Sequence, residues 1–155
     1  MLKAIAAAFL LLAPVACGQT VPRSAPALNL LAPCKGRVAL VAFVVTTCPH
    51  CKAFTKDVME PLYQAKRVCA VAIAFDQDGD TARFAAQQRL TFPVFKLDRE
   101  LVRQFLGLSG PDRRLGTPQV VVIDKHGMIQ AQSTPEGSPL LMQRDVIRDL
   151  VERLQ

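Results

Sequence analysis

The sequence predicts an α/β domain built as a three-layer sandwich, with a mixed central sheet between layers of helices. Two continuous apolar runs, at 38–45 and 68–75, are typical of parallel strands buried on both faces. Helical patterns follow both runs, and a β-hairpin pattern stands at 119–133 before a last helix. This alternation of strands and helices, closed by an antiparallel pair, is the order that builds such a sandwich.

Local signals place the elements between these landmarks. Pro49 fits the first position of a helix that runs to about Met59, because its missing N–H would be unpaired there. The other expected elements are a helix capped by Asp80 that ends near Arg89, a short strand at 92–95, a helix from Asp98 to Gly107, two strands at 119–124 and 128–133, and a C-terminal helix. We expect the last helix to have one apolar face, formed by Leu140, Ile147, Val151 and Leu154.

The composition is that of a globular domain. Of the 155 residues, 50% are hydrophobic and 21% are charged, which excludes a disordered or collagen-like chain. The formal net charge is +6 with no dense cluster of Lys and Arg in the sequence, so we expect a basic surface that faces membrane headgroups or acidic partners. With no Trp and one Tyr, a platform for stacking bases is not expected, nor is a nucleic-acid partner.

The first 18 residues have the layout of an export signal. One Lys precedes an apolar stretch at 4–13, which is too short to span a bilayer, since a spanning helix needs ~20 residues. Ala16 and Gly18 flank Cys17 and resemble a bacterial lipoprotein cleavage site, with Cys17 as the lipidated first residue; ordinary cleavage nearby and a buried N-terminal helix are the alternatives. Export would place the domain in the periplasm or cell envelope, where disulfides form.

We therefore expect a signal peptide at 1–16, a lipid-attached tether at 17–33 and a folded domain at 34–155. The tether contains three Pro and shows little periodicity before Leu28, where order is expected to begin. No internal repeat or low-complexity tract is visible in the sequence.

Cys48, Pro49, His50 and Cys51 carry the candidate chemistry, because they join the end of a buried strand to the first turn of a helix. The unpaired N–H groups and the dipole of that helix stabilise a thiolate at Cys48. Cys51 lies one turn later, within reach of a disulfide. A protonated His50 adds positive charge near Cys48, lowers the pKa of its thiol further and makes the disulfide more oxidising.

We therefore expect Cys48 to be the exposed attacking thiol and Cys51 the more buried thiol that resolves a mixed disulfide. A static disulfide between the two is the alternative, and no organic cofactor is required. A metal site would need two more soft ligands, but the sequence has no second CxxC and no spaced pair of His. His126, the other His of the chain, falls in the hairpin turn, where we expect a solvated side chain.

The strand, CxxC and helix, followed much later by Gly116-Thr117-Pro118 before the hairpin, resemble the thioredoxin superfamily over about 28–154. The resemblance implies a thioredoxin-like sandwich in which a cis bond between Thr117 and Pro118 faces the CxxC. In that family the residue before the cis-proline pairs with substrate backbone beside the attacking thiol. Thr117 and Pro118, together with Pro49, are therefore expected to bind substrate.

The helix and strand at 80–95 resemble an insertion of the TlpA/ResA-like branch, and the run at 117–127 is similar to that branch as well. Its members are exported, membrane-tethered thiol–disulfide oxidoreductases. The resemblance implies disulfide exchange with the thiols or disulfides of envelope proteins. It also implies a membrane-bound redox partner that recycles the enzyme.

Several departures from the family leave the direction of electron flow open. Thr47 stands where the family usually has Trp, and no Pro enters the active-site helix before Pro61. The Pro-His pair of the CPHC motif resembles oxidising DsbA-like proteins instead of TlpA-like reductants. Gln77 stands about where some members carry a buried acid; Asp76 or Asp78 can take that role, or can serve only to shape a turn.

Two other functions share parts of this pattern. A peroxiredoxin would carry a Thr three residues before its reactive Cys and a Pro further upstream, where this chain has Val45 and Val41. A copper-binding assembly factor of the same fold usually shows CxxxC and a distant His ligand, whereas here the spacing is CxxC and His126 lies on the wrong part of the hairpin. The copper-binding factor remains the alternative function, and an interaction module that merely retains CxxC is a third class.

Cys34 and Cys69 are separate from this motif. Cys34 precedes one buried strand and Cys69 begins the next, which should lie beside it in parallel. Both thiols then fall at the end of the sheet opposite the CxxC. They can form a structural disulfide or stay unpaired, and the sequence alone does not decide between the two.

Overall fold

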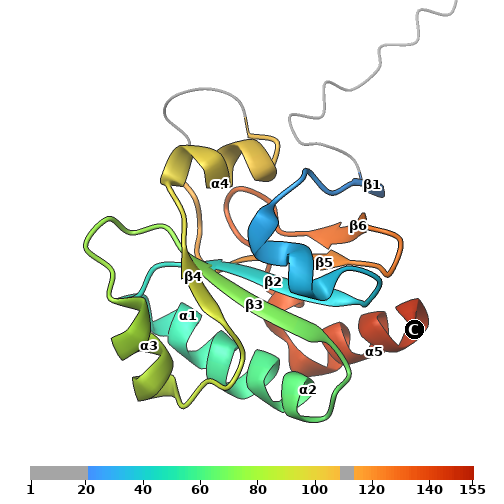
Figure 1. The fold of residues 1–155 in the computed structure, drawn as a ribbon, viewed down its shortest axis with the longest axis horizontal. Coiled ribbons are helices and arrows are strands. Elements are labelled where there is room, and N and C mark those ends of the chain that lie inside the picture. Colours follow the sequence, from blue (N-terminus) through green and yellow to red (C-terminus); the bar gives the residue numbers. More distant parts are fainter. Residues whose placement is uncertain (1–20, 109–113) are drawn as a thin grey trace, which may run out of the picture.

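The central element of the computed structural model is a six-stranded mixed sheet with strand order β1-β6-β5-β2-β3-β4 (Figure 1). The structure describes residues 21–108 and 114–155, so the expected signal peptide and Cys17 lie outside the described residues. The strands are β1 (Arg23–Ser24), β2 (Ala39–Val44), β3 (Cys69–Ala74), β4 (Val94–Lys96), β5 (Gln119–Ile123) and β6 (Met128–Gln132). The pairs β2–β3 and β3–β4 are parallel, and the other pairs are antiparallel.

Helices cover both faces of this sheet, as Figure 1 shows. The consecutive segments α1 (Pro49–Phe54), η2 (Thr55–Met59) and α2 (Glu60–Gln64) lie on one face with α3 (Thr81–Gln88) and α5 (Arg144–Leu154). The 3-10 helix η1 (Asn29–Cys34) and α4 (Arg99–Phe105) lie on the other face. The three-layer sandwich with an added helix and strand, α3 and β4, is therefore confirmed.

The middle strands separate two hydrophobic cores, because successive side chains point to opposite faces. In β2, Leu40, Ala42 and Val44 join the core under α1 and α5, whereas Val41 and Phe43 join the core under α4 and η1. Every residue of β2 and β3 is buried. This two-sided burial explains why both strands appear in the sequence as unbroken apolar runs.

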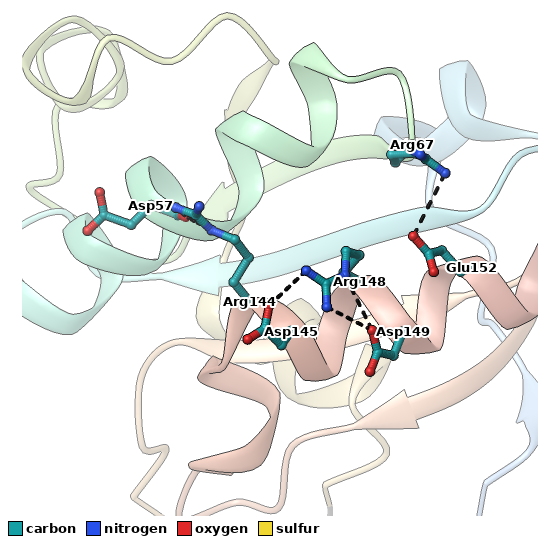
Figure 2. Close-up of polar contacts among 7 residues, drawn as sticks. All are labelled: Asp57, Arg67, Arg144, Asp145, Arg148, Asp149 and Glu152. Carbon is teal, nitrogen blue, oxygen red and sulfur yellow. Dashed lines mark hydrogen bonds and ion pairs between the residues drawn. The ribbon is translucent and has the colours of Figure 1, made fainter.

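The active-site helix is longer than predicted and continues past Met59 to Gln64 through a π-helical turn, η2. Pro61 has no N–H to donate to the preceding turn. In compensation, Arg144 donates from Nε to the main-chain carbonyl of Asp57 at 2.7 Å and from a second guanidinium nitrogen to the same oxygen (Figure 2). Arg144 thereby connects α5 to this helix.

The segment expected as a tether through residue 33 is partly folded onto the domain. β1 pairs with β6, and the Arg23 guanidinium donates to the Phe105 carbonyl at 3.0 Å and to the Gln132 side chain at 2.7 Å. Leu28, Leu30 and Leu31 then pack against the core under η1. Burial of these side chains orders the chain from Leu28, where order was expected to begin, and β1 extends the ordered part back to Arg23.

The C-terminal helix differs from its prediction at one residue. Ile147 and Val151 are fully buried as expected, but Leu140 lies in a separate 3-10 turn, η3 (Leu140–Met142), and is 64% exposed. Gln143 has extended dihedrals and is the N-cap of α5, so the helix begins after Leu140. Leu140 therefore does not lie on the apolar face of α5, where the sequence pattern predicted it. In the described part of the chain, no helix is long and apolar enough to cross a membrane.

Candidate active site

The CxxC motif lies where β2 ends and α1 begins. Cys48 is the N-cap residue of α1: its main-chain N–H donates to the Val45 carbonyl at 3.0 Å, and its Sγ accepts from the Cys51 N–H at 3.4 Å. Pro49 is the exposed first residue of α1, at the position where a missing N–H costs nothing. The free N–H groups of the first turn therefore face the Cys48 sulfur, as predicted.

The two thiols have different environments. Cys48 is partly exposed, whereas Cys51 is fully buried in the core under α1, and both are free cysteines. Burial alone would raise the pKa of the Cys48 thiol, but hydrogen bonds from Thr117 and from the main-chain N–H groups of Cys51 and His50 outweigh it and lower this pKa. Burial raises the pKa of Cys51 to about 12, and the neighbouring Cys48 adds to this rise.

Thr117 faces Cys48 from the start of β5. Its hydroxyl donates to Cys48 Sγ at 3.4 Å, and its carbonyl oxygen lies 3.7 Å from the same sulfur, close enough to accept a bond from the thiol. The Thr117–Pro118 peptide bond is cis, as the resemblance implied, and Pro118 is buried. β5 pairs antiparallel to β2 with Gln119 opposite Phe43, so the residues just before β5 meet those just after β2.

The loop before β5 is held by main-chain contacts that require a small residue. Gln119 Nε2 donates to the Gly116 carbonyl at 2.7 Å and to the Thr134 carbonyl at 3.0 Å. A Cβ added at Gly116 would lie 2.1 Å from the Glu136 carbonyl oxygen, so no larger residue fits without moving the loop. These contacts position Thr117 beside the sulfur.

Asp76 holds the other side of the active-site loop, a contact that the sequence analysis did not identify. One carboxylate oxygen accepts from the Thr46 N–H at 3.1 Å and from the Thr46 hydroxyl at 2.5 Å. Val44 and Ala74 are register partners in β2 and β3, so Thr46 and Asp76 each stand two residues beyond the same point. Gln77, the position suggested by the resemblance, is exposed. Asp76 therefore orients the loop that leads to Cys48.

His50 lies on the exposed surface of α1, next to the partly exposed Cys48. Its main-chain N–H contributes to the lowered pKa of Cys48. Its imidazole makes no hydrogen bond or ion pair with the residues that the structure describes. An effect of the imidazole charge on Cys48 therefore stays a prediction.

A groove of about 350 Å³ adjoins the motif between the active-site loop and α3, lined by Thr46, Thr47, Lys52, Asp78, Arg83 and Phe84 among others. Thr47, which replaces the family's usual Trp, is exposed at its edge. The groove carries side chains of both charges beside the CxxC. Because Thr46 and Thr47, which line it, lead directly to Cys48, the groove is the candidate position for a substrate segment.

The other two described cysteines form a disulfide between Cys34 and Cys69, with Cα atoms 5.4 Å apart. Cys69 pairs with Ala39 at the start of β2, so this bond lies at the sheet end opposite Cys48. His126 lies at that same end, exposed in the turn after β5, far from the CxxC. Within residues 21–108 and 114–155, no three His, Cys, Asp or Glu side chains are grouped to hold a metal ion.

Replacing Thr117 by Val is expected to raise the pKa of the Cys48 thiol, because the variant removes the hydroxyl that donates to its sulfur. When the rate of iodoacetamide alkylation is measured against pH, the midpoint of its increase should then lie at a higher pH than in the wild type. His50→Ala tests the imidazole in the same assay and is expected to shift the profile in the same direction. An unshifted Thr117→Val profile would contradict this role of the hydroxyl; an unshifted His50→Ala profile would leave the imidazole without effect.

The model of the AhpC/TSA family matches residues 24–132 of the chain. No curated protein matches this chain in sequence. Among solved structures, the chain is similar to the thioredoxin domain of a thiol-disulfide oxidoreductase from Bacteroides vulgatus, with a TM-score of 0.65 and 18% identity over 88% of this chain and 99% of that one.

Two further structures share the fold. One is a putative thiol:disulfide interchange protein DsbE from Chlorobium tepidum, with a TM-score of 0.62 and 24% identity over 83% of this chain and 94% of that one. The other is a secreted Mycobacterium tuberculosis disulfide oxidoreductase homologous to E. coli DsbE, with a TM-score of 0.60 and 18% identity over 79% and 86%. The chain thus belongs to the AhpC/TSA family and has the thioredoxin-like fold of these proteins.

Proposed function

We propose that this protein is an exported thiol–disulfide oxidoreductase that exchanges disulfides with envelope proteins through Cys48 and Cys51. The observation that carries the proposal is the asymmetry of the two thiols. Cys48 is accessible and has a lowered pKa, whereas Cys51, one turn away, is buried with its pKa raised to about 12. At neutral pH the first is the better nucleophile and the second stays protonated.

The exchange proceeds in two balanced steps. The Cys48 thiolate attacks one sulfur of a substrate disulfide, which forms a Cys48–substrate disulfide and releases the other substrate sulfur as a thiolate. Cys51 then loses its proton and attacks Cys48 Sγ, which forms the Cys48–Cys51 disulfide and releases the second substrate thiolate. The substrate gains two electrons, which the enzyme loses; the proton from Cys51 and one proton from solvent complete the two substrate thiols. The reverse sequence oxidises a substrate dithiol.

The environment of Cys51 supports this order of events. In the free enzyme the charge on Cys48 is one of the causes that raise the pKa of Cys51. When Cys48 enters a mixed disulfide, it no longer carries that charge, and the Cys51 proton becomes easier to remove. The second step is thus favoured only after substrate is attached.

Thr117, Pro118 and Pro49 form the surface on which a substrate segment would lie. Thr117 presents its carbonyl beside Cys48 Sγ, and Pro49, the residue after Cys48, is exposed. An extended substrate backbone can pair with the main chain of Thr117 while its disulfide reaches Cys48. A membrane-bound dithiol or disulfide partner would then restore the enzyme. The extra α3 and β4 support a place in the TlpA/ResA-like branch.

The disulfide between Cys34 and Cys69 supports an envelope location, since structural disulfides persist in oxidising compartments. The apolar leader and Cys17 support export with a lipid anchor. Several acyl chains hold a protein far better than the marginal binding of one.

Cys17→Ser is expected to move the protein from the membrane fraction of a bacterial host to the soluble fraction, because the variant cannot be acylated. Fractionation and mass spectrometry of the mature N-terminus measure this outcome. A wild-type protein that is soluble and begins, unmodified, beyond residue 17 would contradict the anchor and leave a freely diffusing periplasmic enzyme.

One purified sample distinguishes the proposed function from its alternatives. Thiol–disulfide exchange predicts that catalytic amounts of the protein speed the reduction of insulin by dithiothreitol, with little consumption of hydrogen peroxide. Faster turnover of peroxide than of insulin would indicate a peroxiredoxin. Stoichiometric copper in the reduced protein, with no effect on insulin, would indicate the copper-binding assembly factor.

A further inference from the structure

The sheet end opposite Cys48 carries a cluster of cations that we call the basic pole, defined as Lys35, Arg37, Lys66, Arg67 and Lys125. Arg37, Lys66, Arg67 and Lys125 line one pocket of about 170 Å³. Lys35, Arg37 and Lys125 line a second, larger pocket of about 520 Å³. The two pockets share Arg37 and Lys125, so the five side chains form one continuous surface although they come from three distant segments of the chain.

Much of this positive charge is uncompensated. Lys35, Arg37 and Lys66 are exposed, and their side chains make no hydrogen bond or ion pair with the described residues. Arg67 forms a half-exposed ion pair with Glu152 at 3.9 Å (Figure 2), a geometry that contributes little in water. Lys125 donates to the main-chain oxygen of Gln155 at 2.6 Å.

The acidic side chain within the pole has other partners. Asp124 lines the larger pocket beside Lys125. Its carboxylate accepts from the main-chain N–H groups of His126 and Met128, at 2.8 and 2.9 Å, and from the Gln130 side chain at 2.6 Å. The carboxylate therefore stabilises the hairpin turn. Its single negative charge offsets only one of the five positive charges of the pole.

An apolar surface lies directly beside these cations. The larger pocket is also lined by Ala25, Pro26, Ala27, Leu28, Leu31 and Ala32. Pro26, Ala27 and Ala32 are exposed. Cations next to small exposed apolar groups suit the boundary between lipid headgroups and acyl chains, whereas a site for a soluble anion would not need the apolar part.

The first described strand, β1, ends near this pole. β1 pairs Ser24 with Met128, and the Ala25 N–H donates to the Gly127 carbonyl at 2.9 Å, beside the hairpin turn. Cys17 is four residues before Val21, the first described residue. Four extended residues span at most ~14 Å, so a lipid anchor at Cys17 would keep the domain within that reach of a bilayer.

We propose that the basic pole is a docking surface for anionic phospholipids, which sets the domain on the membrane with Cys48 directed away from it. The six residues of β2 separate the pole from the CxxC by about 20 Å. Docked in this way, the sulfur and the groove beside it face the envelope space, where substrate proteins reach them. The docking is independent of the exchange chemistry.

Vesicle binding of the chain from Gln19 onward tests the docking surface without leader or acyl group. All the described strands, both cores and the Cys34–Cys69 disulfide lie within this part of the chain. We expect it to bind vesicles in which one third of the lipid is phosphatidylglycerol, and not to bind vesicles of phosphatidylcholine alone. Binding should weaken as salt shortens the screening length from ~10 Å at 0.1 M to ~3 Å at 1 M.

The triple variant Lys35→Gln, Arg37→Gln, Lys66→Gln is expected to bind anionic vesicles roughly 100-fold more weakly, at about fivefold per cation removed. The matched control is Lys56→Gln, Arg89→Gln, Arg114→Gln, which removes the same charge from exposed positions outside the pole. The control should bind nearly as the wild type does, and both variants should keep wild-type insulin reduction.

Two results would overturn the docking surface. Equal losses in the pole variant and the control would show only an effect of net charge. The wild-type domain could instead fail to bind anionic vesicles and form a salt-sensitive complex with an acidic envelope protein. That result would show that the pole binds a protein partner.

Discussion

Cys48→Ser is expected to reduce disulfide exchange by several orders of magnitude, because it removes the nucleophile that faces Thr117 and the helix N–H groups. Cys51→Ser should keep the first step and accumulate mixed disulfides, because no second thiol releases the substrate. Both variants remove one sulfur from the same turn, so their different products separate the two roles.

Non-reducing gels of an envelope extract incubated with each variant measure this difference. Cys51→Ser should carry covalent partners that disappear on reduction, and mass spectrometry of those adducts would identify the substrates. Cys48→Ser serves as the matched control and should carry none. Faster alkylation of Cys51 than of Cys48 in the reduced wild type at neutral pH would show that the roles are reversed.

Removal of the second disulfide, by Cys34→Ala together with Cys69→Ala, is expected to lower the free energy of unfolding by about 4 kcal/mol. This bond closes a loop with a sequence separation of 35, and the loss follows from the extra entropy of the open unfolded chain. Such a loss corresponds to a fall in Tm of roughly 10–20 °C in a domain of this size.

Thermal unfolding with and without the two substitutions measures this stability. Insulin reduction at low temperature should stay near the wild-type rate, because the bond lies at the sheet end away from Cys48. An unchanged Tm would show that η1 is held by packing alone. A folded variant without activity would show instead that the disulfide takes part in the exchange.

The fold class and the reactive motif could be predicted from the sequence because their signals are local. The apolar runs that became β2 and β3 are continuous since both faces of each strand are buried. Asp80 and Asp98 cap α3 and α4 as expected, through bonds to N–H groups two or three residues away. Cys48 and Cys51 share one helical turn, so their spacing alone brings them together.

Other features depend on how distant segments meet, and only the tertiary structure decided them. The Thr117 hydroxyl reaches Cys48 because β5 pairs antiparallel to β2, and Asp76 reaches Thr46 because β2 and β3 are in register. Neither register is encoded in a local pattern. The exposed Leu140 shows the same limit, since its helical phase was broken by the extended Gln143.

The basic pole depends on both the sequence and the tertiary structure. Composition determined the excess of positive charge, and no run of the sequence is dense in Lys and Arg. Folding places the turn before β2, the turn before β3 and the hairpin turn after β5 at one end of the sheet, where their cations meet. Charge is a sum over residues and can be read from the sequence, but its concentration on one surface depends on the strand order and therefore required the structure.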